Sequence, residues 1–303
     1  MASQRTRRTF LQESVAAVAG LQAARTTPGA EEQPVKHFLC ITCGIQFAAS
    51  EKPPANCPVC DDERQYVGWN GQQWTTLPQM QGKYHNTITK EEPDLHAIHT
   101  DPKIGIGQRA FVVRTPKGNI LWDCVPHLDE ATIKAVKELG GLAAVAVSHP
   151  HYYTTMVEWS HAFGKAPVYL HKADAQWVMR PDPVIQFWKG DTKELFGGLM
   201  LINTGGHFEG FQVLHWSGGA KEKGALLSGD QPQVCQDRRW VSFMYSYPNL
   251  IPLPAKAIRR ITAALKPFAF SRLYGAFPGL NVTDDAKGAV ERSAARYLRA
   301  IGA

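Results

Sequence analysis

The chain has 303 residues, which is enough for one large domain and a small one. Hydrophobic residues make up 44% and charged residues 20%, as in ordinary globular proteins, and no apolar run is long enough to form a transmembrane helix. The net charge is +6, but most lysines and arginines are scattered along the sequence. This distribution favours a solvated surface over a surface that binds nucleic acid, and it gives no indication of an oligomeric state.

Residues 1–34 have the pattern of an export signal rather than that of a folded domain. Arg7-Arg8 followed by Phe10-Leu11 resembles the twin-arginine export signal of bacteria. A mildly apolar stretch from Val15 to Leu21, and then small residues, give the order basic, apolar, small that such signals share. The resemblance implies export of the folded protein to the periplasm. The alternative is a disordered basic tail on a cytoplasmic protein.

Four of the six cysteines form two C-x-x-C pairs, which predict a small four-cysteine metal knuckle over residues 35–75. Each pair places two thiolates on one side of a turn, and two such turns complete a tetrahedral site. The segment resembles the rubredoxin-like module at the end of rubrerythrins, which implies iron as an alternative to zinc. Two structural disulfides, or free thiols, are the alternatives to a metal. The residues that carry the resemblance are Cys40, Cys43, Gly44, Phe47, Cys57, Pro58 and Cys60.

The other two cysteines stand apart from these pairs. Cys124 follows an apolar, strand-like run and is expected to be a buried small side chain, whereas Cys235 lies close to a motif described below. The sequence leaves open a disulfide between them, because only the fold determines their separation.

Residues 76–104 and residues 105–303 differ in pattern. The first segment is polar and contains Pro93 and Pro102, so we expect it to link the knuckle to a larger domain or to wrap around that domain. From residue 105 onward strand and helix patterns alternate, which is typical of a layered α/β fold. Strands are expected at 110–113, 120–122, 142–147, 167–170, 200–202, 211–216, 225–227 and 272–274. Helices are expected at 129–139, 256–265 and 283–301.

Two histidines follow the apolar run at 142–147, which is expected to be a buried strand. His149 and His151 lie two residues apart, and extended backbone directs such side chains to the same side, so they can share one metal. Further on, two glycines permit a sharp turn that directs His207 inward, and Asp230 follows the strand expected at 225–227. For any one of these histidines a structural role is the alternative, but together they predict a metal site.

These motifs, in this order, resemble the metallo-β-lactamase superfamily over residues 105–280. The anchors are the hairpin that ends in Asp123, the His149-x-His151 loop, the Gly-Gly-His207 turn and Gly229-Asp230. The resemblance implies that residues 105–303 form an α/β, metallo-β-lactamase-type αββα sandwich. It also implies a zinc-dependent hydrolase with a small-molecule substrate. Three neutral imidazoles leave one position on zinc open and lower the pKa of bound water to about 7, which suits attack on an ester, thioester, lactone or amide.

The sequence departs from the family pattern His-x-His-x-Asp-His. Tyr153 stands at the place of the aspartate and Thr154 at the place of the last histidine, and residues 273–277 lack the late histidine of the family. All three losses fall on the second metal position, so we expect a single metal ion. We also expect Asp230 to act as the base and Tyr153 to donate a hydrogen bond to an oxyanion. The predicted ligands of the single ion are His149, His151, His207 and Asp230.

Other residues near these motifs are candidates for supporting roles. Glu158 and His161 would orient the ligands or else be surface charges on a helix. Arg238 and the aromatic residues of 243–248 would border the pocket, where Arg238 could hold a carboxylate, or else pack under a long loop.

The same residues also allow functions other than the hydrolysis of an ester, thioester, lactone or amide. Cleavage of a phosphodiester is disfavoured because it often uses a second metal. Two alternatives from other classes stay open: an iron-containing redox or sensor protein that uses the knuckle, and a non-catalytic binding protein on the same fold.

Overall fold

The computed structural model describes residues 35–303, which form one compact unit. The export signal predicted for residues 1–34 lies outside the described residues and stays a prediction. Within the described part, no helix has both the length and the apolar character that crossing a membrane requires.

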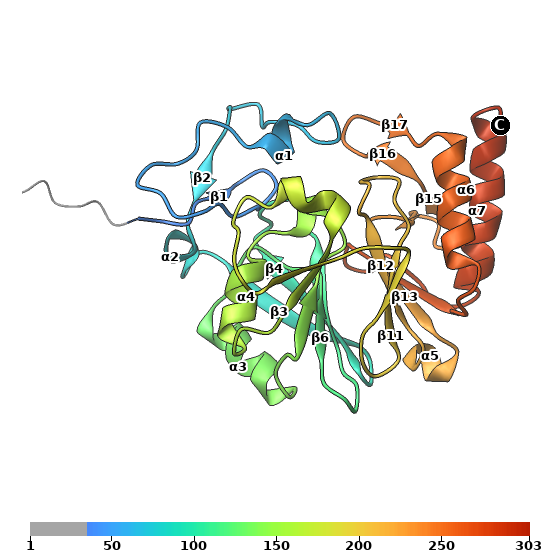
Figure 1. The fold of residues 1–303 in the computed structure, drawn as a ribbon, viewed down its shortest axis with the longest axis horizontal. Helices are drawn as coiled ribbons and strands as arrows, with labels where there is room; N and C mark the ends of the chain where they lie inside the picture. The colour runs from blue at the N-terminus through green and yellow to red at the C-terminus, as the bar shows by residue number, and fades with distance from the viewer. Residues whose placement is uncertain (1–34) are drawn as a thin grey trace, which may run out of the picture. The chain divides into compact units, whose positions relative to one another are not determined.

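Two mixed β-sheets form the centre of this unit (Figure 1). The first sheet is antiparallel from β3 to β6 and parallel from β6 to β9. In spatial order it contains β3 (His85–Glu92), β4 (Leu95–Asp101), β5 (Arg109–Val113), β6 (Ile120–Trp122), β7 (Ala144–Ala146), β8 (Val168–His171) and β9 (Ile185–Trp188).

The second sheet is antiparallel except where β13 pairs with β18. It contains β10 (Thr192–Glu194), β11 (Leu199–Asn203), β12 (Gln212–Trp216), β13 (Ala225–Gly229), β18 (Arg272–Gly275) and β19 (Asn281–Val282). Three short antiparallel pairs lie outside the two sheets: β1 (Leu39–Cys40) with β2 (Trp74–Thr75), β14 (Gln233–Val234) with β15 (Val241–Ser242), and β16 (Met244–Ser246) with β17 (Ile251–Pro252).

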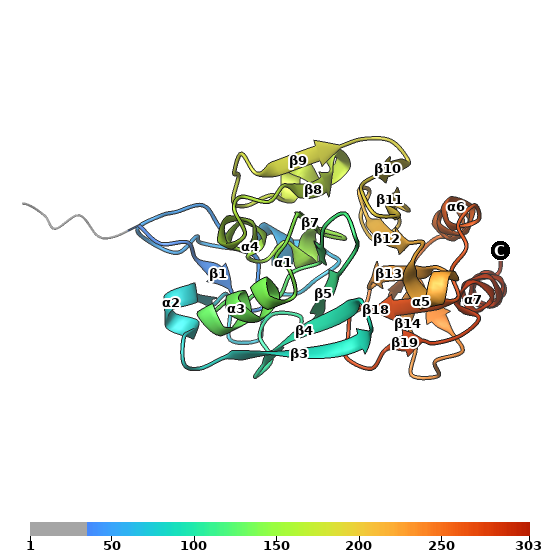
Figure 2. The same cartoon turned by 90° about the horizontal axis from the view of Figure 1, so that it is seen from below.

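Helices cover the outer face of each sheet, which gives the predicted αββα layers (Figure 2). Val136 of α3 and Trp159 of α4 pack in one apolar cluster with strands of the first sheet, and Ile261 of α6 and Val290 of α7 pack with strands of the second. A third cluster joins the inner faces of the two sheets. The helices are α1 (Pro58–Asp61), α2 (Leu77–Met80), α3 (Glu130–Glu138), α4 (Met156–Ala162), α5 (Gly219–Glu222), α6 (Ala255–Leu265) and α7 (Ala286–Ala300), with 3-10 turns η1 (Pro150–Tyr152) and η2 (Lys172–Trp177).

Three of the helices, α3, α6 and α7, form where the sequence pattern predicts them, whereas α1, α2, α4 and α5 were not predicted. Asp129 caps α3 by accepting a hydrogen bond from the backbone nitrogen of Thr132 at 2.8 Å. In α6 the buried residues Ile258, Ile261 and Leu265 recur at helical spacing and form one apolar stripe, which the second sheet covers.

Our prediction that residues 76–104 form a linker was wrong. In this segment β3 and β4 pair with each other, and β4 also pairs with β5, so the two strands extend the first sheet. Half of the residues in the edge strand β3 are exposed and most are polar, so it lacks the apolar alternation that identifies a strand in a sequence. The two prolines do not interrupt these strands. Pro93 lies in the turn between β3 and β4, and Pro102 follows the end of β4.

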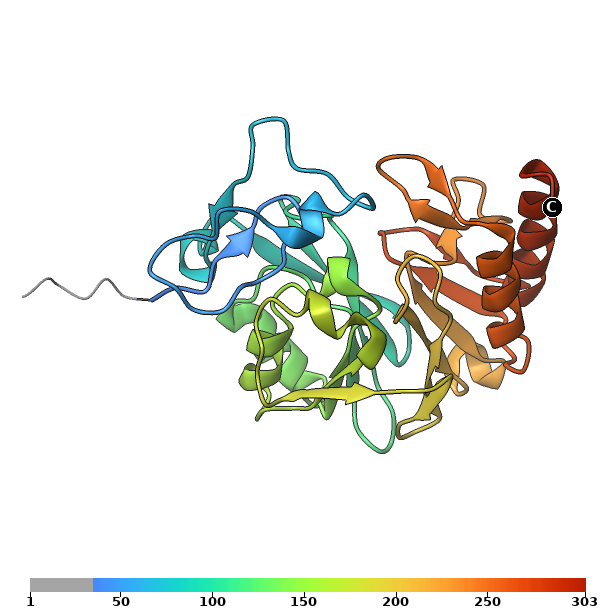
Figure 3. The same cartoon turned by 45° about the horizontal axis from the view of Figure 1, so that its top comes forward.

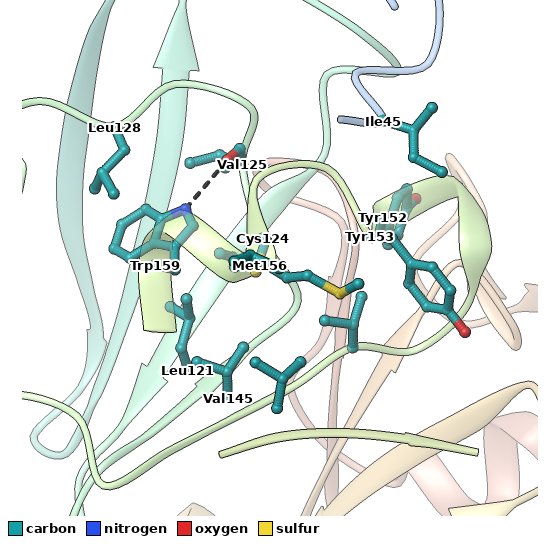
Figure 4. Close-up of a cluster of buried hydrophobic side chains, with 14 of the residues drawn as sticks. Ile45, Leu121, Cys124, Val125, Leu128, Val145, Tyr152, Tyr153, Met156 and Trp159 are labelled. Atoms are coloured by element: carbon teal, nitrogen blue, oxygen red, sulfur yellow. Dashed lines mark hydrogen bonds between the residues drawn. The ribbon is translucent and has the colours of Figure 1, made fainter. Parts of the chain in front are cut away.

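The knuckle of residues 35–75 packs on the layer that contains α3 and α4. Its four cysteines, Ile45 and Phe47 belong to the same apolar cluster as Tyr153 and Met156, and Figure 4 shows Ile45 close to these side chains. A side chain at Gly44 would lie 2.7 Å from Pro126, so the glycine allows this close approach. The knuckle is therefore part of the same compact unit and not a separate domain.

Candidate metal centres

The four cysteines of the knuckle converge on one point. The Sγ atoms of Cys40 and Cys60 are 3.5 Å apart, those of Cys43 and Cys57 are 3.7 Å apart, and all four lie within 4.8 Å of one another. A disulfide has an S–S distance of about 2.05 Å, so the cysteines form no disulfides, and Cys124 and Cys235 are free as well. Cys124 is buried, as predicted.

The local backbone of the knuckle suits a metal. Gly44 has a φ of +83°, and its nitrogen donates to the carbonyl of Cys40 at 2.7 Å, which closes the turn around the first pair. Burial raises the pKa of the Cys43 thiol, and a bound cation would oppose this effect and favour its thiolate. A donor set of four thiolates suits zinc and iron alike.

Three histidines and one aspartate form a second buried group. His149 and His151 follow β7, His207 precedes β12, and Asp230 follows β13. Each offers one ligand atom, and these atoms lie within 4.8 Å of one another. The structure thus brings together all four residues that the sequence predicts as ligands of the single ion.

Hydrogen bonds set the orientation of the imidazole rings and, in His207, which nitrogen carries the proton. Nδ1 of His207 donates to the carbonyl of Tyr245 at 2.7 Å, which leaves its Nε2 unprotonated, 3.2 Å from Nδ1 of His151. Nδ1 of His149 lies 2.9 Å from the hydroxyl of Ser148, and its Nε2 lies 3.5 Å from Oδ2 of Asp230. Within the described part of the chain, Nε2 of His149 and Oδ1 of Asp230 are buried without a hydrogen-bond partner.

The charges of this group are set by burial. Burial lowers the pKa of His207 to about 4 and holds the pKa values of His149 and His151 well below their usual range, so all three are neutral at pH 7 and free to coordinate. Burial, with the nearby carboxyl of Asp123, raises the pKa of Asp230 to about 8. A cation among these residues would oppose this effect and favour the ionised carboxylate.

Neighbouring residues hold both the carboxyl group and the backbone of Asp230 in place. Gly229 has a φ of +59°, and a Cβ atom there would lie 2.7 Å from the hydroxyl of Ser148, so the glycine permits the close approach of β13. The hydroxyl of Tyr152 donates to Oδ2 of Asp230 at 3.2 Å, and the hydroxyl of Tyr247 donates to its backbone carbonyl at 2.8 Å.

A cavity of about 350 Å³ opens onto His151, His207 and Asp230. Most of its other lining residues are uncharged, and Lys103 is the one lysine or arginine among them. The cavity is large enough for a small molecule.

Tyr153 is not placed for the role that we predicted. Like Tyr152, it is buried in the apolar cluster with Ile45 and Met156 (Figure 4). It does not line the cavity, and its hydroxyl makes no hydrogen bond to the four predicted ligands. The neighbouring Tyr152 instead contacts Asp230. Our assignment of the oxyanion donor to Tyr153 was therefore wrong, because the 3-10 turn η1 separates adjacent side chains by about a third of a turn.

The other candidates for supporting roles lie away from the histidines. Glu158 pairs with Arg180 at 2.5 Å, and His161 lies 3.2 Å from Asp182. Arg238 donates to three backbone carbonyls in its surroundings, which leaves its guanidinium engaged in holding the loop. Of the aromatic run, Tyr247 does line the cavity.

Sequence reasoning missed the part that the knuckle plays in the pocket. Thr42, Gln65 and Tyr66 of the knuckle line the cavity, and Arg64 donates to the backbone carbonyl of His207 at 3.3 Å. Arg64, Gln65 and Tyr66 lie outside the C-x-x-C motifs, and their distance from His207 in the sequence hides the contact.

Comparison of the sequence with known proteins identifies one relative of high identity. No protein-family model matches it. It is 50% identical over 267 residues to the uncharacterized protein YmaE of Bacillus subtilis (strain 168), a match that covers 88% of this chain and 97% of that protein.

Solved structures show the same fold at low sequence identity. The DIM-1 metallo-β-lactamase matches with a TM-score of 0.54 and 16% identity, over 71% of this chain and 98% of that one. VMB-1 matches with a TM-score of 0.54 and 13% identity, over 72% and 99%. A metallo-β-lactamase from Pontibacter korlensis matches with a TM-score of 0.50 and 17% identity, over 70% and 99%. The chain thus has the metallo-β-lactamase fold, and it belongs to the same family as YmaE of Bacillus subtilis.

Proposed function

We propose that this protein is a hydrolase with a single catalytic metal ion, zinc, at the histidine site. The observation that carries the proposal is the buried group of His149, His151, His207 and Asp230, in which ligand atoms converge within 4.8 Å. Buried polar atoms without a hydrogen-bond partner are costly, and a bound cation removes this cost at Nε2 of His149. The residues present therefore fit a metal ion.

The described residues favour one ion at this site rather than two. The positions that would complete a second ligand set are Tyr153, which is buried in an apolar cluster, and Thr154. Within residues 35–303, the groups of His, Cys, Asp and Glu that could hold a metal are the four cysteines and the group at His149. A hydroxyl group is a poor ligand for zinc compared with imidazole, thiolate or carboxylate.

The side chains around the cavity support the hydrolysis of an ester, thioester, lactone or amide. A zinc ion held at this site would polarise a carbonyl group and make water nucleophilic near neutral pH. Tyr152 hydrogen-bonds to Oδ2 of Asp230 and so leaves Oδ1 free to accept a proton from the attacking water. Ile106 and Phe277 offer apolar contacts to a substrate, and Lys103 offers a cation to an acidic group on it.

Substitution of one ligand tests the proposal. His151→Ala removes one of the three imidazoles, and we expect loss of the metal at this site and at least a 100-fold loss of turnover (about 3 kcal/mol in activation free energy). The measurements are metal content and a screen of neutral and carboxylate-bearing esters, thioesters, lactones and amides. His161→Ala is the matched control, because His161 pairs with Asp182 and lies outside the group of ligands.

The outcomes separate the proposal from its alternatives. A wild-type protein that binds the metal but hydrolyses none of these compounds would favour a binding protein on the same fold. Equal metal content at the histidine site in His151→Ala and His161→Ala would contradict the ligand assignment itself.

A further inference from the structure

The segment Asp62–Tyr66, which directly follows α1 in the knuckle, lies against the histidine site. It approaches the β16–β17 hairpin, as Figures 1 and 3 show. Three hydrogen bonds of 2.9 to 3.1 Å join its backbone carbonyls to the side chains of Ser246 and Asn249 in this hairpin. The knuckle is thereby attached to the β16–β17 hairpin, which also contacts His207 through Tyr245.

Arg64 is the central side chain of this contact. Its Nη1 donates to the carbonyl of His207 at 3.3 Å, and its guanidinium carbon lies 4.0 Å from the centre of the Phe208 ring. Asp62 accepts from Nε at 2.5 Å and from Nη2 at 2.8 Å. The side chain is 13% exposed, so the planar guanidinium is held in a fixed direction.

The imidazole of His207 depends on the same segment. Its Nδ1 donates to the carbonyl of Tyr245, which lies in β16. The hydroxyl of Tyr245 in turn donates to the carboxylate of Glu63 at 2.6 Å. The backbone of His207 is therefore held through Arg64, and its ring is held through a residue that contacts Glu63.

The direction of the Asp62–Tyr66 segment is set by the four-cysteine group. The preceding helix α1 has four residues, which is too short to be stable by itself. The sulfurs of Cys57 and Cys60, near its two ends, lie within 4.8 Å of those of Cys40 and Cys43, whose turn packs on the main core. A metal bound to the four thiolates would thus fix the point from which Arg64 extends.

We propose that Arg64 is a positioning residue of the histidine site, and that the four-cysteine knuckle raises the metal affinity of that site through Arg64. Loss of the knuckle metal releases the Asp62–Tyr66 segment and lets His207 leave its coordinating orientation. This inference rests on the metal ion proposed above, and its test measures metal affinity rather than turnover. A wild-type protein without metal at the histidine site would contradict the proposed function, whereas equal affinity with and without Arg64 would contradict this inference alone.

The test compares the affinity of the histidine site for cobalt(II) in full-length variants. Arg64→Met keeps an unbranched side chain and removes the guanidinium, and we expect the Kd for cobalt(II) to rise about 10-fold, the lower end of what groups behind metal ligands contribute. We also expect its ligand-field spectrum to shift, because His207 changes orientation. A purely structural role would lower the melting temperature and leave the spectrum unchanged.

Arg239→Met is the matched control. Arg239 pairs with Asp237 two residues earlier, as Arg64 pairs with Asp62, but it is 82% exposed. We expect its Kd to stay within about twofold of the wild-type value, since exposed ion pairs contribute little. A wild-type Kd and spectrum in Arg64→Met would overturn the proposal. A tighter Kd would overturn it as well, because it would mean that the positive charge of Arg64 merely repels the ion.

Two further variants keep the proposal testable. Arg64→Lys retains the charge and lacks the planar fork, so we expect it to restore less than half of the lost binding free energy. If Arg64→Met does not fold, a wild-type Kd in Arg64→Lys overturns the proposal. In Cys40→Ser with Cys57→Ser the knuckle loses its metal, and we expect the histidine site to bind cobalt(II) about 10-fold more weakly. An unchanged Kd in this variant would show that the knuckle does not support the site.

Discussion

At the scale of single residues, the two adjacent tyrosines after His151 have different surroundings. The hydroxyl of Tyr152 reaches Asp230, and the ring of Tyr152 lies 4.4 Å from that of His149, centre to centre. Tyr153 is buried in the same apolar cluster of the first sheet as Tyr152, but its hydroxyl makes no hydrogen bond to Asp230. A difference of one position at the end of the 3-10 turn η1 thus decides which of two buried tyrosines reaches Asp230.

These surroundings predict different effects of the same substitution. Tyr152→Phe removes the hydrogen bond that orients the carboxylate of Asp230, and we expect turnover to fall about 10-fold with the metal retained. Tyr153→Phe removes a hydroxyl that contacts no residue of the histidine site, and we expect turnover within about twofold of wild type. Steady-state kinetics on the best substrate of the screen, with metal analysis of both proteins, would check this. A larger loss in Tyr153→Phe than in Tyr152→Phe would reverse our assignment.

At the scale of elements, a buried carboxyl joins η2 to the loop that carries His207. Oδ1 of Asp174 accepts from the nitrogen of Gly210 at 2.8 Å, and a Cβ atom on Gly210 would lie 2.6 Å from its Cγ. The side chain is 1% exposed, and burial raises the pKa of Asp174 to about 7. The charged groups that act on it are Arg64, which lowers the pKa, and Glu209, which raises it.

This shift predicts a pH-dependent effect of Asp174→Asn on stability. The unfolded carboxyl ionises at about pH 4, so between pH 4 and 7 only the folded chain holds the proton. The contribution of Asp174 to the free energy of unfolding therefore falls as the pH rises through this window and stays low above it. Asparagine does not ionise, so we expect the melting temperature of the variant, relative to wild type, to increase by several degrees from pH 5 to pH 8. Thermal unfolding at both pH values measures this, and a difference that is constant with pH would disprove it.

At the scale of the whole molecule, two candidate metal centres share one compact unit. The four cysteines belong to the same apolar cluster as Met156 and Trp159 of α4, the helix that follows the histidine loop. The knuckle also lines the cavity of the histidine site. A module of this size has little core of its own, and here the core of the larger domain supplies the contacts that it lacks.

This arrangement predicts two metal ions per full-length chain, one at each centre. Cys40→Ser with Cys57→Ser removes two of the four thiolates, and we expect one equivalent of metal to remain at saturating zinc, because the histidine site has its own complete ligand set. Metal analysis by mass spectrometry gives the count, and the colour of the wild-type protein distinguishes ferric iron from zinc in the knuckle. Two equivalents in the double variant would refute the assignment of the knuckle.

The layered fold of residues 105–303 and both sets of candidate ligands could be predicted from the sequence. Apolar periodicity predicted most of the strands and helices there because each element must cover one face of the core. The C-x-x-C pairs and the His149-x-His151 motif are local, so the spacing within a turn or loop already directs their side chains together. A polar edge strand such as β3 escaped this reasoning because half of its residues are exposed.

How the knuckle, the histidine loop and the second sheet contact one another could not be predicted from the sequence. The contact of Arg64 with His207 joins residues 143 positions apart, and no local pattern specifies which surface a loop will touch. Likewise, the choice between Tyr152 and Tyr153 depends on the path of η1 relative to β13, which carries Asp230 at its end. Contacts of this kind follow from the packing of whole elements against one another, and that packing depends on many side chains at once.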